Sequence, residues 1–137
     1  MYVLDTTALS ALMRLDPSHV GRLIETEPAD VRLPQPAVAE VRYGLACLPP
    51  SRRRRSLQSR LDVLLDSIER TPWSDAVSTR FGTLKALLES RGRRLEDFDL
   101  MMAAHALELD ATLVTSNVRH FARVPGLSIE DWAQRKS

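Results

Sequence analysis

The stretch that decides the fold is Tyr2-Val3-Leu4-Asp5-Thr6-Thr7, near the start of the chain. Three strand-favouring apolar residues lead directly into an acid, and two threonines precede a helical apolar pattern at 8–15. This order predicts a short buried strand, a tight turn and a helix that Thr6 or Thr7 caps. Asp5 then lies at the carboxyl end of the first strand, where ligands bind in open α/β sheets. The alternative is that Asp5 is only the helix N-cap and has no chemical role.

Short strand-like runs alternate with helical patterns along the rest of the chain. Strands are predicted at 31–33, 112–115 and 128–129, with an extended break at 71–73. Helices are predicted at 20–27 after a Ser18 cap, and at 36–48, 52–68, 75–91 and 98–109. Gly92 is suited to the position just after a helix. Such alternation is typical of an α/β fold with a parallel sheet covered on both faces, and we expect one domain over 1–137.

The composition excludes several classes of protein. No apolar run approaches the roughly 20 residues that span a bilayer, and the N-terminus lacks a signal-peptide pattern. The single cysteine, Cys47, cannot form an intramolecular disulfide and has no metal-ligand spacing around it, so we expect a cytoplasmic protein. Arginine supplies nearly all of the positive charge, since lysine occurs only at 85 and 136. This composition suits phosphate binding, although a GC-rich genome would also produce it.

Glu40 is an unusual residue within the predicted helix 36–48. The core stripe of this helix consists of Val38, Val41, Leu45 and Leu48. A second row beside it contains small residues and one carboxylate: Ala37, Glu40, Gly44 and Cys47. Small side chains allow close approach, so we expect Glu40 to face another part of the molecule. The alternative is a rim ion pair of Glu40 with Arg42 or Arg22.

The predicted helix 98–109 is apolar nearly all the way round, which is typical of a buried helix. Asp99 lies in its first turn, beside the apolar stripe. A carboxylate on a buried helix is costly unless it is paired or binds a metal ion. His105 lies deeper in the same helix among small residues, and we interpret it as a hydrogen-bonded core histidine rather than a ligand.

Oxygen-bearing side chains dominate the predicted crevice. Asp5 and Asn117 follow strands, while Glu40 and Asp99 belong to neighbouring helices. A set of oxygen ligands without a cysteine or histidine cluster favours a hard cation, Mg²⁺ or Mn²⁺. Without such an ion, carboxylates this close would raise one another's pKa values. The chemistry that this site supports is metal-assisted attack of water on a phosphodiester.

Four consecutive arginines, Arg52, Arg53, Arg54 and Arg55, begin the predicted helix 52–68. Cations at a helix N-terminus oppose the helix dipole, so helix propensity does not explain them. One interpretation is contact with a nucleic-acid phosphate backbone, and the alternative is a solvated, self-repelling helix end.

Five segments in register resemble a PIN-domain ribonuclease, and more narrowly the VapC-type toxins of type II toxin–antitoxin modules. The segments are Val3–Thr7, Val38–Gly44, Phe98–Leu107, Thr112–Phe121 and Val124–Leu127. The resemblance implies a three-layer α/β/α fold with a central, mostly parallel sheet. It also implies a Mg²⁺- or Mn²⁺-dependent endoribonuclease, with transfer RNA as the common target of the family. Such toxins usually form homodimers or hetero-oligomers with a cognate antitoxin that inhibits them.

The resemblance also assigns roles to individual residues. Asp5 matches the first acid of the family, Glu40 the second and Asp99 the third. Many PIN domains have a fourth acid at the position that Asn117 occupies here, and this departure weakens any second metal site. Asp97 is close enough in sequence to substitute in part, and its alternative role is that of an N-cap.

Other classes of protein remain as alternatives to a toxin. A non-toxin PIN nuclease that processes RNA would have the same acids. A phosphoryl-accepting domain also places an acid after its first strand, but usually needs a second acid nearby, whereas Thr6 and Thr7 follow Asp5. A non-catalytic nucleic-acid-binding module could use the arginines but has no need for buried carboxylates. Neither a P-loop nor a glycine-rich dinucleotide turn is present in the sequence.

Overall fold

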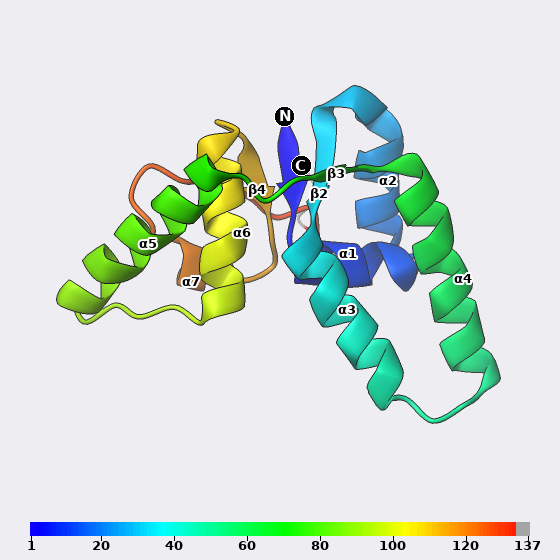
Figure 1. Cartoon of the computed structure of the whole chain (residues 1–137). Coiled ribbons are helices and arrows are strands. Elements are labelled where there is room, and N and C mark those ends of the chain that lie inside the picture. The colour runs from blue at the N-terminus through cyan, green and yellow to red at the C-terminus, as the bar shows by residue number, and fades with distance from the viewer. Residues whose placement is uncertain (134–137) are drawn as a thin grey trace.

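The structure is a computed structural model that describes residues 1–133, and its centre is a five-stranded sheet (Figure 1). The strands are β1 (Tyr2–Leu4), β2 (Val31–Pro34), β3 (Glu69–Thr71), β4 (Thr112–Val114) and β5 (Ser128–Glu130). They lie in the order β3-β2-β1-β4-β5, and every neighbouring pair is parallel. The mostly parallel sheet that the sequence predicts is therefore confirmed.

Helices connect the strands and cover both faces of the sheet. They are α1 (Thr6–Met13), α2 (Pro17–Glu25), α3 (Gln35–Cys47), α4 (Arg52–Ser67), α5 (Asp75–Ser90), α6 (Asp97–Glu108) and α7 (Val118–Phe121). A short 3₁₀ turn, Pro28–Asp30, precedes β2. The arrangement is the predicted three-layer α/β/α fold (Figure 1). None of the helices in the part of the chain that the structure describes is long and apolar enough to cross a membrane.

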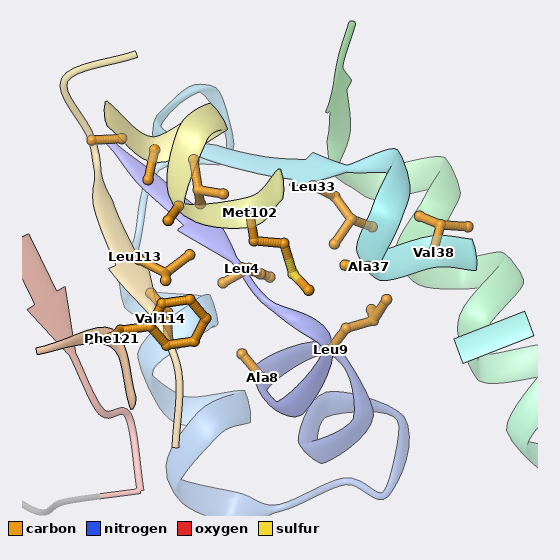
Figure 2. Packing of buried hydrophobic residues seen from close by; sticks show 14 of the residues in the cluster. Leu4, Ala8, Leu9, Leu33, Ala37, Val38, Met102, Leu113, Val114 and Phe121 are labelled. Carbon is orange, nitrogen blue, oxygen red and sulfur yellow. The ribbon is translucent and has the colours of Figure 1, made fainter. Parts of the chain in front are cut away.

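The hydrophobic core packs α6 and α3 against the central strands. Figure 2 shows Met102 of α6 reaching toward Leu4 of β1, with Leu113 and Leu33 on either side. All four side chains are at most 1% exposed. Because β1 and β4 are buried on both faces, their short apolar runs were readable from the sequence.

The strand order determines where a site can form. From β1 the chain continues to β2 on one side, while β4 and β5 lie on the other side. The crevice at the carboxyl ends of β1 and β4 is therefore the topological switch point of the sheet, where the connecting segments diverge. Asp5 follows β1 directly and Thr115 follows β4, so both residues lie at this crevice.

Two predicted helix caps are wrong. The N-cap of α1 is Asp5 rather than Thr6 or Thr7, since the Asp5 carboxylate accepts a hydrogen bond from the backbone N–H of Ala8. Asp16 likewise caps α2, and the predicted cap Ser18 instead donates its hydroxyl proton to the carbonyl of Trp132. An acid before a helix offers an acceptor as good as serine or threonine, so the local sequence could not separate these candidates.

Strand β3 was predicted only as an extended break. It pairs with β2 through Arg32 and Glu69, at the edge of the sheet. Glu69 and Arg70 are exposed and only Thr71 is buried, so β3 lacks the apolar alternation that reveals a strand. Helix α7 was not predicted at all, because four residues are too few to show a helical period.

Two local predictions on helices are confirmed. Gly92 follows α5 with a φ of 64°, the left-handed conformation that glycine adopts without strain. His105 is 1% exposed, and its Nδ1 lies 3.1 Å from the hydroxyl of Thr71. Burial lowers the pKa of the His105 imidazole. It is therefore a neutral core residue and belongs to the packing of α6 against β3.

Candidate active site

Asp5 combines a capping role with nearly complete burial at the switch point. Asp5 is only 1% exposed to solvent. Its Oδ1 accepts hydrogen bonds from the Thr7 hydroxyl at 2.6 Å and from the Ala8 N–H at 2.9 Å. Burial raises the pKa of the Asp5 carboxyl, and hydrogen bonds from Thr115, Thr7 and Ala8 partly oppose this effect. Capping alone does not need a buried acid, because a serine would serve equally well.

The end of β4 is fastened to the start of α1 through threonine hydroxyls. The Thr7 hydroxyl, which donates to Asp5, accepts a hydrogen bond of 2.9 Å from the N–H of Ser116. The Thr115 hydroxyl accepts one of the same length from the N–H of Asn117. These bonds fix the loop after β4 beside Asp5. From the sequence, Thr7 was predicted only as a possible helix cap and no role was predicted for Thr115.

Glu40 lies on the second turn of α3 and faces the same crevice. Its Oε1 accepts a hydrogen bond of 2.5 Å from the hydroxyl of Thr6, the first residue of α1. Glu40 is partly buried, and no ion pair within residues 1–133 involves it. The predicted orientation of Glu40 toward another element is confirmed, and the rim ion pair with Arg42 or Arg22 is absent from the described residues.

Asp99 lies opposite, in the first turn of α6. Burial, followed by the charges of Glu40, Asp5 and Glu96, raises the pKa of the Asp99 carboxyl to about 6. Only charges close to one another produce such an effect. The three acids that the sequence singled out, from three separate elements, therefore share one electrostatic site.

Two further titratable side chains lie near Asp99, and neither was predicted from the sequence. Glu96 precedes α6 and adds to the negative potential, whereas His120 on α7 lowers the pKa of Asp99. Residues three apart on a helix face the same side, so the spacing of Glu96 and Asp99 could have predicted that Glu96 lies near Asp99. The alternative fourth acid, Asp97, faces α5 and pairs with Lys85 at 2.9 Å. It is neither directed to the acids nor the N-cap, which is Glu96.

Asn117 occupies the position before α7 at the end of the β4 loop. It is exposed, and its carbonyl accepts the N–H of Phe121 at 3.3 Å. Its amide side chain makes no hydrogen bond to any residue among 1–133. The structure thus places Asn117 beyond the carboxyl end of β4, as predicted, with a side-chain amide that has no hydrogen-bond partner among the described residues.

The acids do not form a closed cage for a metal ion. No group of three or more histidine, cysteine, aspartate or glutamate side chains within the described chain is arranged to hold one. Mg²⁺ rarely needs such a cage, because it keeps several waters and binds through one or two carboxylates together with substrate phosphate oxygens. A few partly engaged carboxylates in an open crevice fit this manner of binding.

The four arginines of α4 have different surroundings. Arg53 lines a hollow between α1, α3 and α4 that also contains Glu40, and we call it the Glu40 hollow. Arg52 and Arg55 line a separate, open depression on α4. Arg54 turns back and donates to the carbonyl of Leu48 at 3.2 Å, which satisfies a group at the end of α3. Only three of the four arginines therefore point to surfaces that a ligand could reach.

Comparison with known proteins agrees with this geometry. The sequence matches the PIN domain family over residues 2–127. It is 30% identical over 134 residues to ribonuclease VapC2 of Rickettsia felis, covering 96% of this chain and 98% of the relative. It is 27% identical over 135 residues to the tRNA(fMet)-specific endonuclease VapC of Salmonella typhimurium, covering 96% and 97%.

The fold agrees equally well with a solved structure. The crystal structure of VapBC2 from Rickettsia felis bound to a promoter DNA fragment contains a chain that superposes with a TM-score of 0.83. The two chains are 30% identical, and the superposition covers 96% of this chain and 98% of that chain. The family match, the shared fold and the acids at the switch point lead to one conclusion: this chain belongs to the PIN domain family and, within it, to the VapC ribonucleases.

Proposed function

We propose that this protein is a metal-dependent endoribonuclease that acts as the toxin of a toxin–antitoxin pair. The observation that carries the proposal is the convergence of Asp5, which follows β1, with Glu40 of α3 and Asp99 of α6. Burial, together with the charges of the neighbouring acids, raises the pKa of Asp99 to about 6. A fold gains nothing in stability by bringing like charges together in a partly buried crevice. Function is the reason for such an arrangement, because active sites are where perturbed carboxylates gather.

The chain holds each acid by a different device. Asp5 is fixed at Oδ1 by Thr7 and Ala8, and Thr115 also donates to its carboxylate. Glu40 is fixed by Thr6 at Oε1, which leaves Oε2. Asp99 makes no hydrogen bond through its side chain within residues 1–133, so both of its oxygens can bind. One or two of these carboxylates, together with water and substrate phosphate oxygens, would hold the metal, and Asn117 could add a neutral ligand.

A divalent cation, Mg²⁺ or Mn²⁺, would supply an activated water and stabilise charge on the cleaved phosphate. The carboxylates of the protein would neutralise the charge of the cation and orient the attacking water. In this proposal Glu40 and Asp99 would direct the attacking water, while Asp5 would anchor the site to the end of β1. Asn117 brings no charge to the position where many PIN domains have a fourth acid, so a second ion would be held more weakly than the first.

Transfer RNA is the substrate that the relative's name suggests, since one relative is a tRNA(fMet)-specific endonuclease. The exposed arginines of α4 would contact its backbone, because guanidinium groups bind phosphates bidentately. Within the described residues Arg52, Arg53 and Arg55 form no ion pair with a carboxylate, so all three are available.

Inhibition by a partner protein follows from the same charge excess. Within residues 1–133 none of the three acids forms an ion pair, so an antitoxin that sends an arginine or lysine side chain to them would be bound strongly and would displace the metal. The two-part name VapBC2 of the similar complex supports such a partner. We also propose that the toxin forms homodimers, or hetero-oligomers with the antitoxin.

The test is cleavage of total RNA by purified protein, followed by sequencing of the new 5′ ends. We expect cleavage with Mg²⁺ or Mn²⁺ and none with EDTA. Asp5→Asn, Glu40→Gln and Asp99→Asn should each reduce the rate about 100-fold or more, and double variants should be barely slower than single ones. Multiplicative losses in correctly folded protein would contradict a shared site. Cleavage that persists at full rate in EDTA would exclude a metal-dependent enzyme.

The antitoxin is tested by co-expression of the chain with the product of the adjacent gene. A toxin should arrest growth when expressed alone and should not when the partner is present. A complex that forms and still cleaves RNA at the full rate would contradict inhibition. A chain that cleaves RNA without arresting growth would favour the alternative of an RNA-processing PIN nuclease.

A further inference from the structure

The Glu40 hollow has room for one aromatic ring. Its volume is about 180 Å³, and apolar side chains such as Val41 and Leu45 form most of its wall. A cavity of about 150 Å³ is known to hold one benzene ring. The Glu40 hollow therefore has the size and the lining of a pocket for one planar, partly apolar group.

The position of the hollow restricts what that group can be. Glu40 and Thr6 belong both to the acid site and to the wall of the hollow. An RNA phosphate at the acids is covalently joined to a nucleoside on each side. The base of one adjacent nucleotide therefore lies within reach of the hollow whenever RNA is cleaved.

The charge around the hollow also favours nucleic acid. Arg14 and Arg53 line it, and together with Arg60 they line a second depression that adjoins it. Arg52, Arg55 and Arg60 line a third. None of these arginines pairs with a carboxylate anywhere in residues 1–133. A continuous cationic surface leads away from the hollow along α4, and a polyanion matches it better than the apolar side chain of a protein partner.

We propose that the Glu40 hollow binds one nucleobase next to the cleaved phosphodiester and thereby determines the base preference at that position. This inference rests on the proposed ribonuclease function and adds a specificity pocket to it. Val41 and Leu45 would make apolar contact with the face of the ring, and such contact tolerates any base. Ser10 and Arg14 supply the hydrogen-bonding groups that distinguish one base edge from another.

Gly44 provides a means of closing the hollow without disturbing the fold. It lies on α3 and lines the hollow, and a Cβ added there meets no atom within 4 Å. Leucine is a better helix former than glycine, so Gly44→Leu should fold and place its side chain into the hollow. Gly82→Leu is the matched control, because Gly82 is likewise an open position within a helix, α5, away from the site.

The two variants are compared by cleaving total RNA in the presence of Mg²⁺ and sequencing the new 5′ ends. We expect Gly44→Leu to lower the cleavage rate about 10-fold relative to Gly82→Leu, which is the usual loss when one base contact is removed. The base preference at one position beside the cut should weaken in Gly44→Leu, and Gly44→Ala should lie between Gly44→Leu and wild type. Equal rates and equal base preferences for Gly44→Leu and Gly82→Leu would overturn the proposal.

A binding measurement in EDTA separates this proposal from the ribonuclease function. Fluorescently labelled oligonucleotides of A, C and U are titrated with each protein, so no cleavage is needed. We expect wild type and Gly82→Leu to discriminate among the three and Gly44→Leu to bind them about equally. Loss of discrimination would support the pocket even if wild type failed to cleave RNA. Unchanged discrimination, with Gly44→Leu weakening only the complex with the antitoxin, would assign the hollow to the protein partner and overturn the proposal.

Discussion

The hydroxyl of Thr6 donates a hydrogen bond of 2.5 Å to Oε1 of Glu40, which lies 34 positions further along the chain. Thr6 follows the capping residue Asp5 directly, so one turn of α1 positions two of the three acids. The same hydroxyl lies 3.8 Å from the sulfur of Met102, and its one carboxylate partner within the described residues is Glu40. We therefore assign it a positioning role, acting through Glu40.

The first prediction concerns this hydrogen bond. Thr6→Val keeps the shape of the side chain and removes its hydroxyl, so Glu40 loses its fixed orientation. We expect cleavage to slow about 10-fold with little change in the RNA dissociation constant, because only the orientation of a catalytic group is lost. Thr6→Ser, which restores the hydroxyl, should recover most of the rate. A purely structural role would instead lower the melting temperature of Thr6→Val and leave the cleavage rate of its folded fraction unchanged.

The second prediction concerns the stability of metal-free protein. The Asp99 carboxyl has its pKa raised from 3.8 to about 6, so the folded chain binds this proton more tightly than the unfolded chain. Wild-type stability should therefore fall as the pH rises through that interval. At neutral pH Asp99→Asn removes the penalty, and we expect the free energy of unfolding in EDTA to rise by about 1 kcal/mol after allowance for solvent screening.

Two comparisons by chemical denaturation make this test specific. Mg²⁺ should stabilise wild type, because a ligand that binds only the native state raises the free energy of unfolding. It should stabilise Asp99→Asn much less, because that variant lacks one of the proposed ligands. Asp5→Asn should gain less in EDTA than Asp99→Asn, because the charged acceptor that caps α1 is lost with the charge. A variant Asp99→Asn that is less stable than wild type in EDTA would identify Asp99 as a structural residue.

The third prediction concerns the arginines of α4. Arg52→Gln combined with Arg55→Gln leaves the Glu40 hollow intact and removes two exposed cations. RNA binding in EDTA should weaken about equally for all sequences, and the log–log salt dependence should flatten by about one to two units.

Two other substitutions complete the arginine test. Arg70→Gln with Arg80→Gln removes the same charge from β3 and α5 and should leave the slope unchanged. Arg54→Gln should reduce stability rather than the slope, because Arg54 bonds to Leu48. An unchanged slope in the Arg52 and Arg55 double variant would mean that these residues are only a solvated helix end.

The fourth prediction concerns His105. Burial lowers the pKa of its imidazole, so the folded chain resists protonation more than the unfolded chain does. Stability should therefore fall as the pH is lowered below about 6.5, the ordinary histidine value. His105→Gln should be less stable near pH 7 by about 1–2 kcal/mol, through lost packing against Trp73, and should lack this acid dependence. Measuring both proteins in the Asp99→Asn background removes the opposite contribution of Asp99. Parallel pH profiles would exclude a buried neutral imidazole.

The sequence by itself determined the fold class and the acids of the candidate site. The strands β1 and β4 are buried on both faces, and α6 is apolar nearly all the way round. The burial of each element can therefore be predicted from its own run of apolar residues. Asp5, Glu40 and Asp99 were found because an acid at a strand end or on a buried helix is out of place unless it has a partner or a ligand.

Only the tertiary structure decided which neighbours complete that site. Glu96 rather than Asp97 lies beside Asp99, because the rotation of α6 about its axis turns Asp97 toward Lys85 on α5. Strand β3 exists because β2 offers an unpaired edge to Glu69–Thr71, although these residues have no strand pattern of their own. Arg54 leaves the arginine row because the turn after α3 brings the Leu48 carbonyl within its reach. In each case the outcome depends on how neighbouring elements are oriented toward one another, and local propensity contains no information about that orientation.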